Sequence, residues 1–220
     1  MTSLARLADG MDRIVRSIGQ GIGWIILPLI LTIMFDVVTR KVDFIRLYFS
    51  EFTINYGYSI STILQDLQWH FHAMLLMLTF GFGYLRNAHV RVDIFREMLP
   101  RRQQAWVEFF GLLFLAVPFL VLMIRYGWDL MYLSWQQGEG SDSMTGIDYR
   151  YVIKAFVPLG FVVALMSVIA TLIRLGQFLF GSAEQKDYAL SKLEIFPDDS
   201  DLQAAREAAE RALRENGGGS

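Results

Sequence analysis

The apolar stretch WHFHAMLLMLTFGFGYL, residues 69–85, and the charged stretch RNAHVRVDIFREMLPRRQQ, residues 86–104, together decide how this chain folds. The first is mostly apolar, and the second carries five arginines, one histidine and two carboxylates. Another long apolar run follows at 106–128. A helix needs about 20 mostly apolar residues to cross a bilayer. The pattern is therefore typical of two membrane-spanning helices joined by a basic hinge at the membrane surface.

The composition agrees with a membrane protein. Of the 220 residues, 54% are hydrophobic, against about 45–50% in an average soluble domain, and the mean hydropathy is +0.36. The apolar residues are gathered into blocks and do not follow a helical or strand period. A net charge of −2 gives no basic excess for nucleic acid. The absence of cysteine excludes disulfides, thiol catalysis, iron–sulfur clusters and cysteine-based zinc sites.

Four segments have the length and composition of membrane spans. Pro28, Pro118 and Pro158 lie inside spans and predict kinks, since neighbouring helices can satisfy the backbone groups that a proline frees. The first segment follows three arginines, as a signal peptide would, but no small-residue cleavage site follows it, so we expect it to be retained. The fold class is therefore an all-α integral membrane protein whose four spans are residues 18–38, 69–85, 106–128 and 151–173.

Lysine and arginine in the short loops predict the orientation of these spans. Three arginines precede the first span and five lie between the second and third, whereas the last loop, about residues 129–150, is acidic. We therefore expect both termini in the cytoplasm and the acidic loop outside. The chain then divides into a cytoplasmic N-terminal segment (1–17), a transmembrane domain (18–176) and a polar cytoplasmic tail (177–216). GGGS at 217–220 has the composition of an artificial linker and is excluded from function.

Two polar segments outside the spans are expected to be helical. Residues 47–68 are amphipathic and aromatic but not apolar enough to span. They form either an interfacial helix on the outer surface or an outward extension of span two, and the sequence does not decide between the two. In the tail, Ser200 is placed to cap a helix over 201–216, with Leu202 and Leu213 on one apolar stripe.

The span centres carry almost no ionisable residues. Such residues usually mark an ion or proton path inside a membrane, and an independent carrier usually shows broken helices and inverted repeats. Asp36, Glu108 and Lys154 all lie close to span ends. A self-sufficient channel or carrier is therefore disfavoured, and the sequence contains no grouping of residues typical of an enzyme.

The histidines raise the alternative of a haem-binding anchor subunit in a redox complex. His70 and His72 are two residues apart, about 200° around one helix, so they cannot ligate one iron from the same face. His89, the remaining histidine, lies beyond the opposite end of the same span. We therefore predict no haem, metal or other cofactor.

The hinge at 86–104 has three interpretations. A positive-inside hinge explains the arginines, but it explains less well why His89, Arg91 and Asp93 alternate with valines. A network that holds the hairpin or docks a partner would use such a pattern, and a substrate site is the third possibility. A short helix is expected at 93–99, with Pro100 in the first turn of span three. Contact with lipid phosphate or a partner is possible for Arg40, Arg96, Arg101 and Arg102.

Three stretches carry a resemblance to a known family. HVRVD at 89–93, after an apolar span, resembles the signature of the small membrane subunit (the DctQ family) of TRAP transporters, the tripartite ATP-independent periplasmic transporters. Residues 64–95 resemble the variant in proteins labelled mannitol or chloroaromatic-compound type, and YRYVIKAFVPLGFVV at 149–163 resembles the last span of the family. The similarity covers roughly 21–176. Asp66 departs from it, because the family often has glutamate there, and the tail lies outside it.

The resemblance implies a three-part importer in the bacterial inner membrane. A periplasmic binding protein captures an organic solute, often a carboxylate, and a large elevator-type subunit moves it with sodium. The small subunit is a scaffold, neither enzyme nor carrier, that contacts the large subunit and phospholipids. The outer carboxylates Glu139, Asp142 and Asp148 either form a solvated loop or touch the binding protein. The residues expected at partner or structural interfaces are Trp69, His70, His89, Arg91, Asp93, Lys154 and Pro158.

Overall fold

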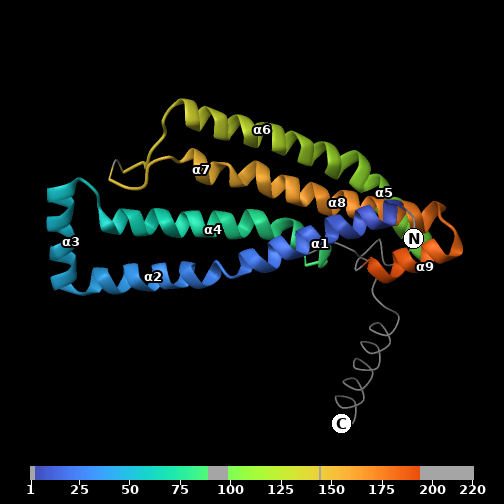
Figure 1. The fold of residues 1–220 in the computed structure, drawn as a ribbon, viewed down its shortest axis with the longest axis horizontal. Coiled ribbons are helices and arrows are strands. Elements are labelled where there is room, and N and C mark those ends of the chain that lie inside the picture. Colours follow the sequence, from blue (N-terminus) through green and yellow to red (C-terminus); the bar gives the residue numbers. More distant parts are fainter. Residues whose placement is uncertain (1–2, 89–98, 144, 194–220) are drawn as a thin grey trace, which may run out of the picture.

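The computed structural model describes residues 3–88, 99–143 and 145–193. All regular elements within these ranges are helical, and the long helices run side by side, with α3 across one end and α9 at the other (Figure 1). The short helix expected at 93–99 and the tail helix expected at 201–216 lie wholly or largely outside the described residues. The elements are α1 Ser3–Gly23, α2 Ile26–Lys41, α3 Asp43–Tyr56, α4 Ile60–Leu85, α5 Arg101–Gly111, η1 Leu112–Ala116, α6 Val117–Gln136, α7 Tyr151–Lys154, α8 Phe156–Phe180 and α9 Ala183–Lys192.

Three helices of the described chain are long and apolar enough to cross a membrane. They are Ser3–Lys41, Arg101–Gln136 and Tyr151–Phe180, which contain the expected first, third and fourth spans. The expected second span lies in α4, whose 26 residues measure about 39 Å at about 1.5 Å per residue. Glutamine, aspartate and histidine in its first half lower its hydropathy, so α4 has the length of a span but not the composition. Four spans therefore remain a proposal.

The first of these helices is interrupted. Between α1 and α2, Trp24 N–H and Ile25 N–H donate to carbonyls only three residues back, at 3.3 and 2.9 Å. The interruption lies just before Pro28, which has no N–H to continue a helical ladder. The sequence predicts a single span at 18–38, whereas the structure divides it and extends the helix on both sides.

Helix α8 forms the centre of the bundle. In its apolar window 44% of the residues are buried, against 11% in each of the other two candidate spans. Small residues bring it close to α4. A Cβ on Gly160 would lie 2.6 Å from the carbonyl oxygen of Met77, and one on Gly81 would lie 2.8 Å from that of Val163. The buried Ser167 hydroxyl donates to the Gly81 carbonyl across this contact at 3.0 Å. This is how helices pack when apolar burial alone cannot drive association in lipid.

The candidate span Arg101–Gln136 contains a local distortion. Residues 112–116 form a π-helical turn directly before Pro118, the second residue of α6. A proline lacks the N–H that would bond to the carbonyl four residues earlier, and a wider turn accommodates the misfit. Pro100, expected in the first turn of this span, is instead its N-cap, and its carbonyl accepts from Gln103 and Gln104.

The stretch at 47–68, for which the sequence allows two arrangements, belongs to two helices. Its first part belongs to α3, which ends at Gly57 in the left-handed region (φ 76°) and stands across the end of the bundle (Figure 1). Its second part begins α4, where the Ser59 hydroxyl caps the helix by accepting from Thr62 N–H at 3.4 Å. The stretch therefore contains a separate helix and the first turns of α4.

Candidate functional site

The candidate site lies where the start of α4 meets the loop between α6 and α7. An open hollow of about 600 Å³ is lined by α4 on one side and by the loop and α7 on the other. Three of the seven expected interface residues come together there, namely Trp69 and His70 from α4 and Lys154 from α7. The hollow also takes in Asp66 and Arg150.

Asp66 fastens the loop to α4. Its Oδ2 accepts from the backbone N–H of Ile147 at 2.9 Å, although the two residues are 81 positions apart. The N–H of Ser59 donates to the Thr145 carbonyl at 2.9 Å. A Cβ on Gly146 would lie 2.1 Å from the Asp66 carboxylate, so a side chain at this position would push the loop away. The site thus depends on a carboxylate at 66 and on glycine at 146.

The loop is also held by its own charges. Glu139 pairs with Nζ of Lys154, and its Oε1 lies 3.7 Å from Nη1 of Arg150. Arg150 makes a two-pronged contact with Asp142, at 2.5 and 3.1 Å. The bond to Lys154 holds the pKa of Glu139 below its usual value, and the bond to Asp142 raises the pKa of Arg150 further. Glu139 and Asp142 are therefore part of a folded structure in the loop, while Asp148 is exposed at its edge.

The two α4 residues present different surfaces to the hollow. Trp69 is 74% exposed. His70 is half-buried, and its Nδ1–H donates to the Asp66 carbonyl at 2.5 Å. An exposed indole beside a fixed polar cluster is the composition that binding surfaces favour, since tryptophan supplies large contact area at low entropic cost.

The other expected residues lie elsewhere. Pro158 is buried further along the bundle, where its Cδ would be 3.2 Å from a Cβ on Gly127 of α6. Nε of Arg40 pairs with Asp36 Oδ1 at 3.0 Å, so Arg40 has a partner within this chain. Arg101 and Arg102 are exposed at the start of α5. His89, Arg91, Asp93 and Arg96 lie outside the described residues.

Sequence reasoning missed a second charged cluster, at the opposite end of the bundle. The Arg174 side chain is 3% exposed, and its Nη2 lies 3.1 Å from Asp9 and 3.2 Å from Asp12. Tyr188 of α9 donates to Asp9 at 2.5 Å. The available signal was the spacing of Asp9 and Asp12, which places both on one face of a helix.

Comparison with known proteins assigns the chain to a family. The family model described as tripartite ATP-independent periplasmic transporters, DctQ component, matches residues 29–177. The chain belongs to this family. No curated protein and no solved structure matched it.

Membership confirms the family resemblance of the sequence and makes this DctQ component part of a transport system. The match runs from α2 to α8 and so contains the whole candidate site, while all of α1 and all of α9 lie outside it. Together with the three apolar helices, it identifies the chain as a membrane-embedded transport subunit. The mannitol or chloroaromatic subtype stays a prediction. Among the residues described, no three His, Asp or Glu side chains are grouped to hold a metal ion.

Proposed function

We propose that this chain is the static scaffold subunit of a TRAP importer in the bacterial inner membrane. It packs against the large elevator-type subunit, which moves an organic solute, such as a carboxylate, with a sodium gradient. The observation that supports this most directly is the family match, which implies association with a large subunit and a substrate-binding protein.

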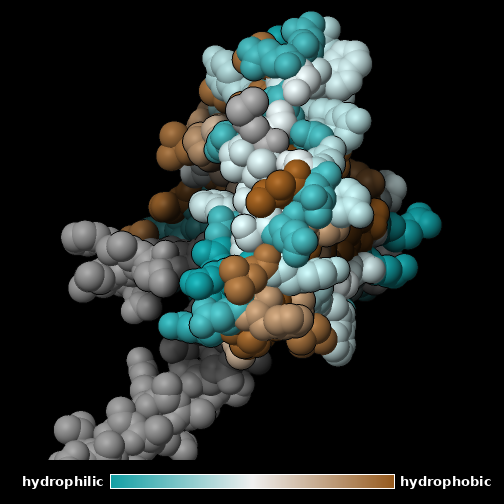
Figure 2. Space-filling model, turned by 90° about the vertical axis from the view of Figure 1, so that its left-hand side faces the viewer, coloured by the Kyte–Doolittle hydropathy of each residue, from teal (hydrophilic) through white to brown (hydrophobic). Residues whose placement is uncertain are grey.

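The distribution of apolar surface supports a scaffold. The windows in Ser3–Lys41 and Arg101–Gln136 are apolar but only 11% buried, so most of their surface needs lipid or another subunit against it. Figure 2 looks onto the end of the molecule that carries α3; teal and white side chains cover much of this end, and brown ones lie between them and along its sides. This distribution suits helices embedded in a membrane with this end at the membrane surface.

The proposed topology has four spans, with α4 as the second and both termini in the cytoplasm. The polar first half of α4 faces the candidate site and the bundle. Its polar side chains are less costly to hold in the membrane when the large subunit covers them. The α6–α7 loop and the hollow then face the periplasm, where Trp69, His70 and Lys154 meet the binding protein or the large subunit. His89, Arg91 and Asp93 hold the inner hinge against the large subunit.

The test is the native mass of the subunit extracted from its own membrane in mild detergent. A complex of about one to one with a much larger membrane protein supports the scaffold. A chain that leaves the membrane alone, as a homo-oligomer or with bound haem contradicts it, and haem would favour a redox anchor. Solute flux by the chain alone in liposomes would favour a small carrier. Arg91→Ala and Asp93→Ala are expected to lower the yield of the complex without preventing membrane insertion.

A further inference from the structure

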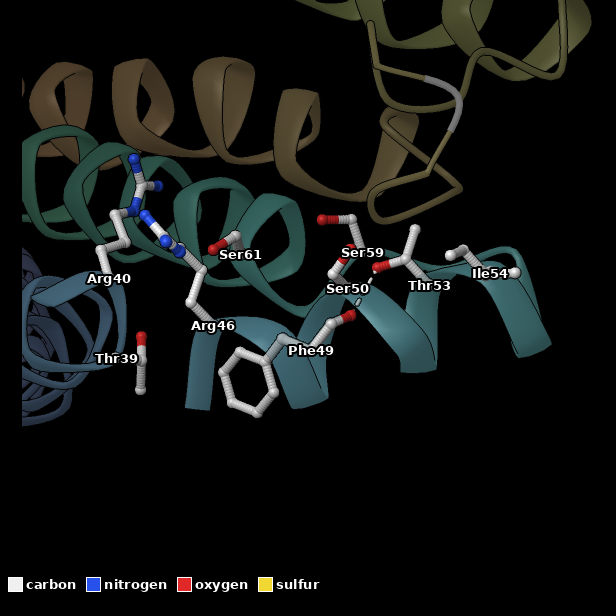
Figure 3. Close-up of a pocket in the computed structure, with 9 residues that line it drawn as sticks. All are labelled: Thr39, Arg40, Arg46, Phe49, Ser50, Thr53, Ile54, Ser59 and Ser61. Carbon is white, nitrogen blue, oxygen red and sulfur yellow. Dashed lines mark hydrogen bonds between the residues drawn. The ribbon is translucent and has the colours of Figure 1, made fainter. Parts of the chain in front are cut away.

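A second hollow lies at the corner where α2 ends and α3 turns across the bundle. It encloses about 320 Å³ and is lined by Arg40 of α2, Arg46 of α3 and several hydroxyl side chains. In Figure 3 the guanidinium groups of Arg40 and Arg46 both point toward α4, and the Ser61 hydroxyl points toward the guanidinium group of Arg46. Two arginines from different helices therefore line the same small space.

Arg40 is held in place by its neighbours. Its Nε pairs with Asp36, whose side chain is 9% exposed and whose other oxygen accepts from Gln68 at 3.4 Å. With its amide oxygen turned toward Arg40, Gln65 accepts from Nη1 at 3.2 Å and from Nη2. These contacts use only part of the five N–H donors of a guanidinium, and the Arg40 side chain is still 46% exposed. Arg40 is thus fixed in direction while some of its donors face the hollow.

Arg46 is held much more loosely. It pairs with Asp43 at 3.0 Å, but the two side chains are 64% and 81% exposed. Such surface pairs contribute about 0–1 kcal/mol, so another anion can replace the carboxylate at little cost. The hollow therefore combines one oriented arginine with one that is easily recruited.

The surroundings of the hollow are those of a membrane surface. It lies at the end of the candidate span Ser3–Lys41. The adjoining α3 has no buried residue and exposes large apolar side chains, including Phe44 at 79% and Ile54 at 82%. A helix with such side chains lies well in the interface between headgroups and acyl chains. An anion reaching the arginines from this side would come with hydrocarbon attached.

We propose that Arg40 and Arg46, with the hydroxyl of Ser61, bind the phosphate of a phospholipid headgroup. Guanidinium groups match phosphate oxygens in geometry and donate charge-assisted hydrogen bonds. Inorganic phosphate offers the same oxygens. Asp36 and Asp43 cancel much of the positive charge, however, which suits a singly charged phosphodiester better than a doubly charged free phosphate.

The test is lipid binding by the full chain in mild detergent, titrated with phosphatidylglycerol and followed by native mass spectrometry. Arg46→Gln is expected to weaken binding roughly tenfold, in line with the loss of a hydrogen bond between charged groups. The matched control is Arg125→Gln. Arg125 is 67% exposed and pairs with Asp129 on one helix, but it does not line this hollow.

Equal binding by the wild-type chain and Arg46→Gln would overturn the proposal. Equal losses in Arg46→Gln and Arg125→Gln would also overturn it, because they would show attraction to surface charge in general. A third arm adds inorganic phosphate in large excess. If phosphate displaced the lipid in an Arg46-dependent way, the site would be one for free phosphate and the assignment to lipid would be wrong. None of these outcomes depends on the large subunit, so the result is separate from that of the scaffold test.

Discussion

The two ends of the bundle carry similar charges in opposite settings. At the α9 end, Arg174 is 3% exposed and is enclosed by carboxylates from α1. At the α3 end, Lys154, Glu139 and Arg150 side chains remain 24–29% exposed around an open hollow. A buried ion pair cannot lose one partner without leaving a charge out of water, whereas an exposed pair can exchange its partner for solvent. We infer that the first cluster holds helices together and that the second presents a surface.

The buried cluster joins parts of the chain that lie far apart in the sequence. Arg174 lies 165 residues from Asp9, and Asp12 is also held by Arg16 at 3.1 Å. Tyr188 adds α9 to the same cluster through Asp9, and this bond raises the pKa of Tyr188. The cluster around Arg174 therefore connects α1, α8 and α9.

The largest effect is expected from breaking the buried cluster. Arg174→Met leaves Asp9 and Asp12 without their shared cation, and losses of about 3–5 kcal/mol are typical when one partner of a buried pair is removed. The measurement is thermal unfolding in detergent, with Arg13→Met, an exposed arginine of α1, as the control. Adding Asp9→Asn and Asp12→Asn to Arg174→Met should recover part of the loss. Equal melting temperatures for Arg174→Met and Arg13→Met would show that the cluster does not hold the helices together.

An intermediate effect is expected from Asp66, which holds the α6–α7 loop against α4 at the exposed end. Asp66→Ala removes the acceptor for Ile147 N–H, and a hydrogen bond to a charged group contributes about 1.5–3 kcal/mol. The loss should be local, so hydrogen exchange at residues 145–150 should rise more than elsewhere. Asp148→Ala, an exposed carboxylate of the same loop, is the control. If both variants exchanged alike, Asp66 would not be what fastens the loop.

The contrast between the ends also explains what the sequence could predict. Long apolar blocks dictate helices of span length wherever they occur, so the helices at 106–128 and 151–173 were predictable. Trp69, His70 and Lys154 could be named because the family resemblance implies a scaffold and because they lie near the ends of the expected spans. The second expected span, 69–85, lies in α4, but this helix begins earlier, at Ile60, and its polar first half meets the α6–α7 loop through Asp66.

The buried cluster could not be predicted in the same way. Arg174 near the end of an apolar helix resembles any cytoplasmic arginine, and Asp9 lies in a segment expected to be a simple polar leader to span one. Their pairing depends on the path of α1 along α4 and α8, which hydropathy does not encode. The interruption at Trp24 and Ile25 is similar, because Pro28 predicts a bend but not the place where the helix opens.

The smallest effect is expected from breaking the ion pair between Glu139 and Lys154 at the exposed end. Lys154, and more weakly Arg150, hold the pKa of Glu139 below its usual value. A carboxyl group with a lowered pKa in the folded state stabilises the fold above its unfolded pKa, and this contribution disappears as the pH falls through the folded value. Because the Glu139 side chain is 29% exposed, the contribution should be under about 1 kcal/mol.

Wild-type stability should therefore decline slightly as the pH drops below the ordinary pKa of glutamate, while Glu139→Gln removes that part of the decline. Lys154→Gln should remove much of the same part, and the double variant should add little, as a double-mutant cycle of unfolding curves at several pH values would show. If stability declined with pH to the same extent in all three variants, Glu139 and Lys154 would be separated in solution. The hollow between α4 and α7 would then lack the fixed charges from which we infer a docking surface.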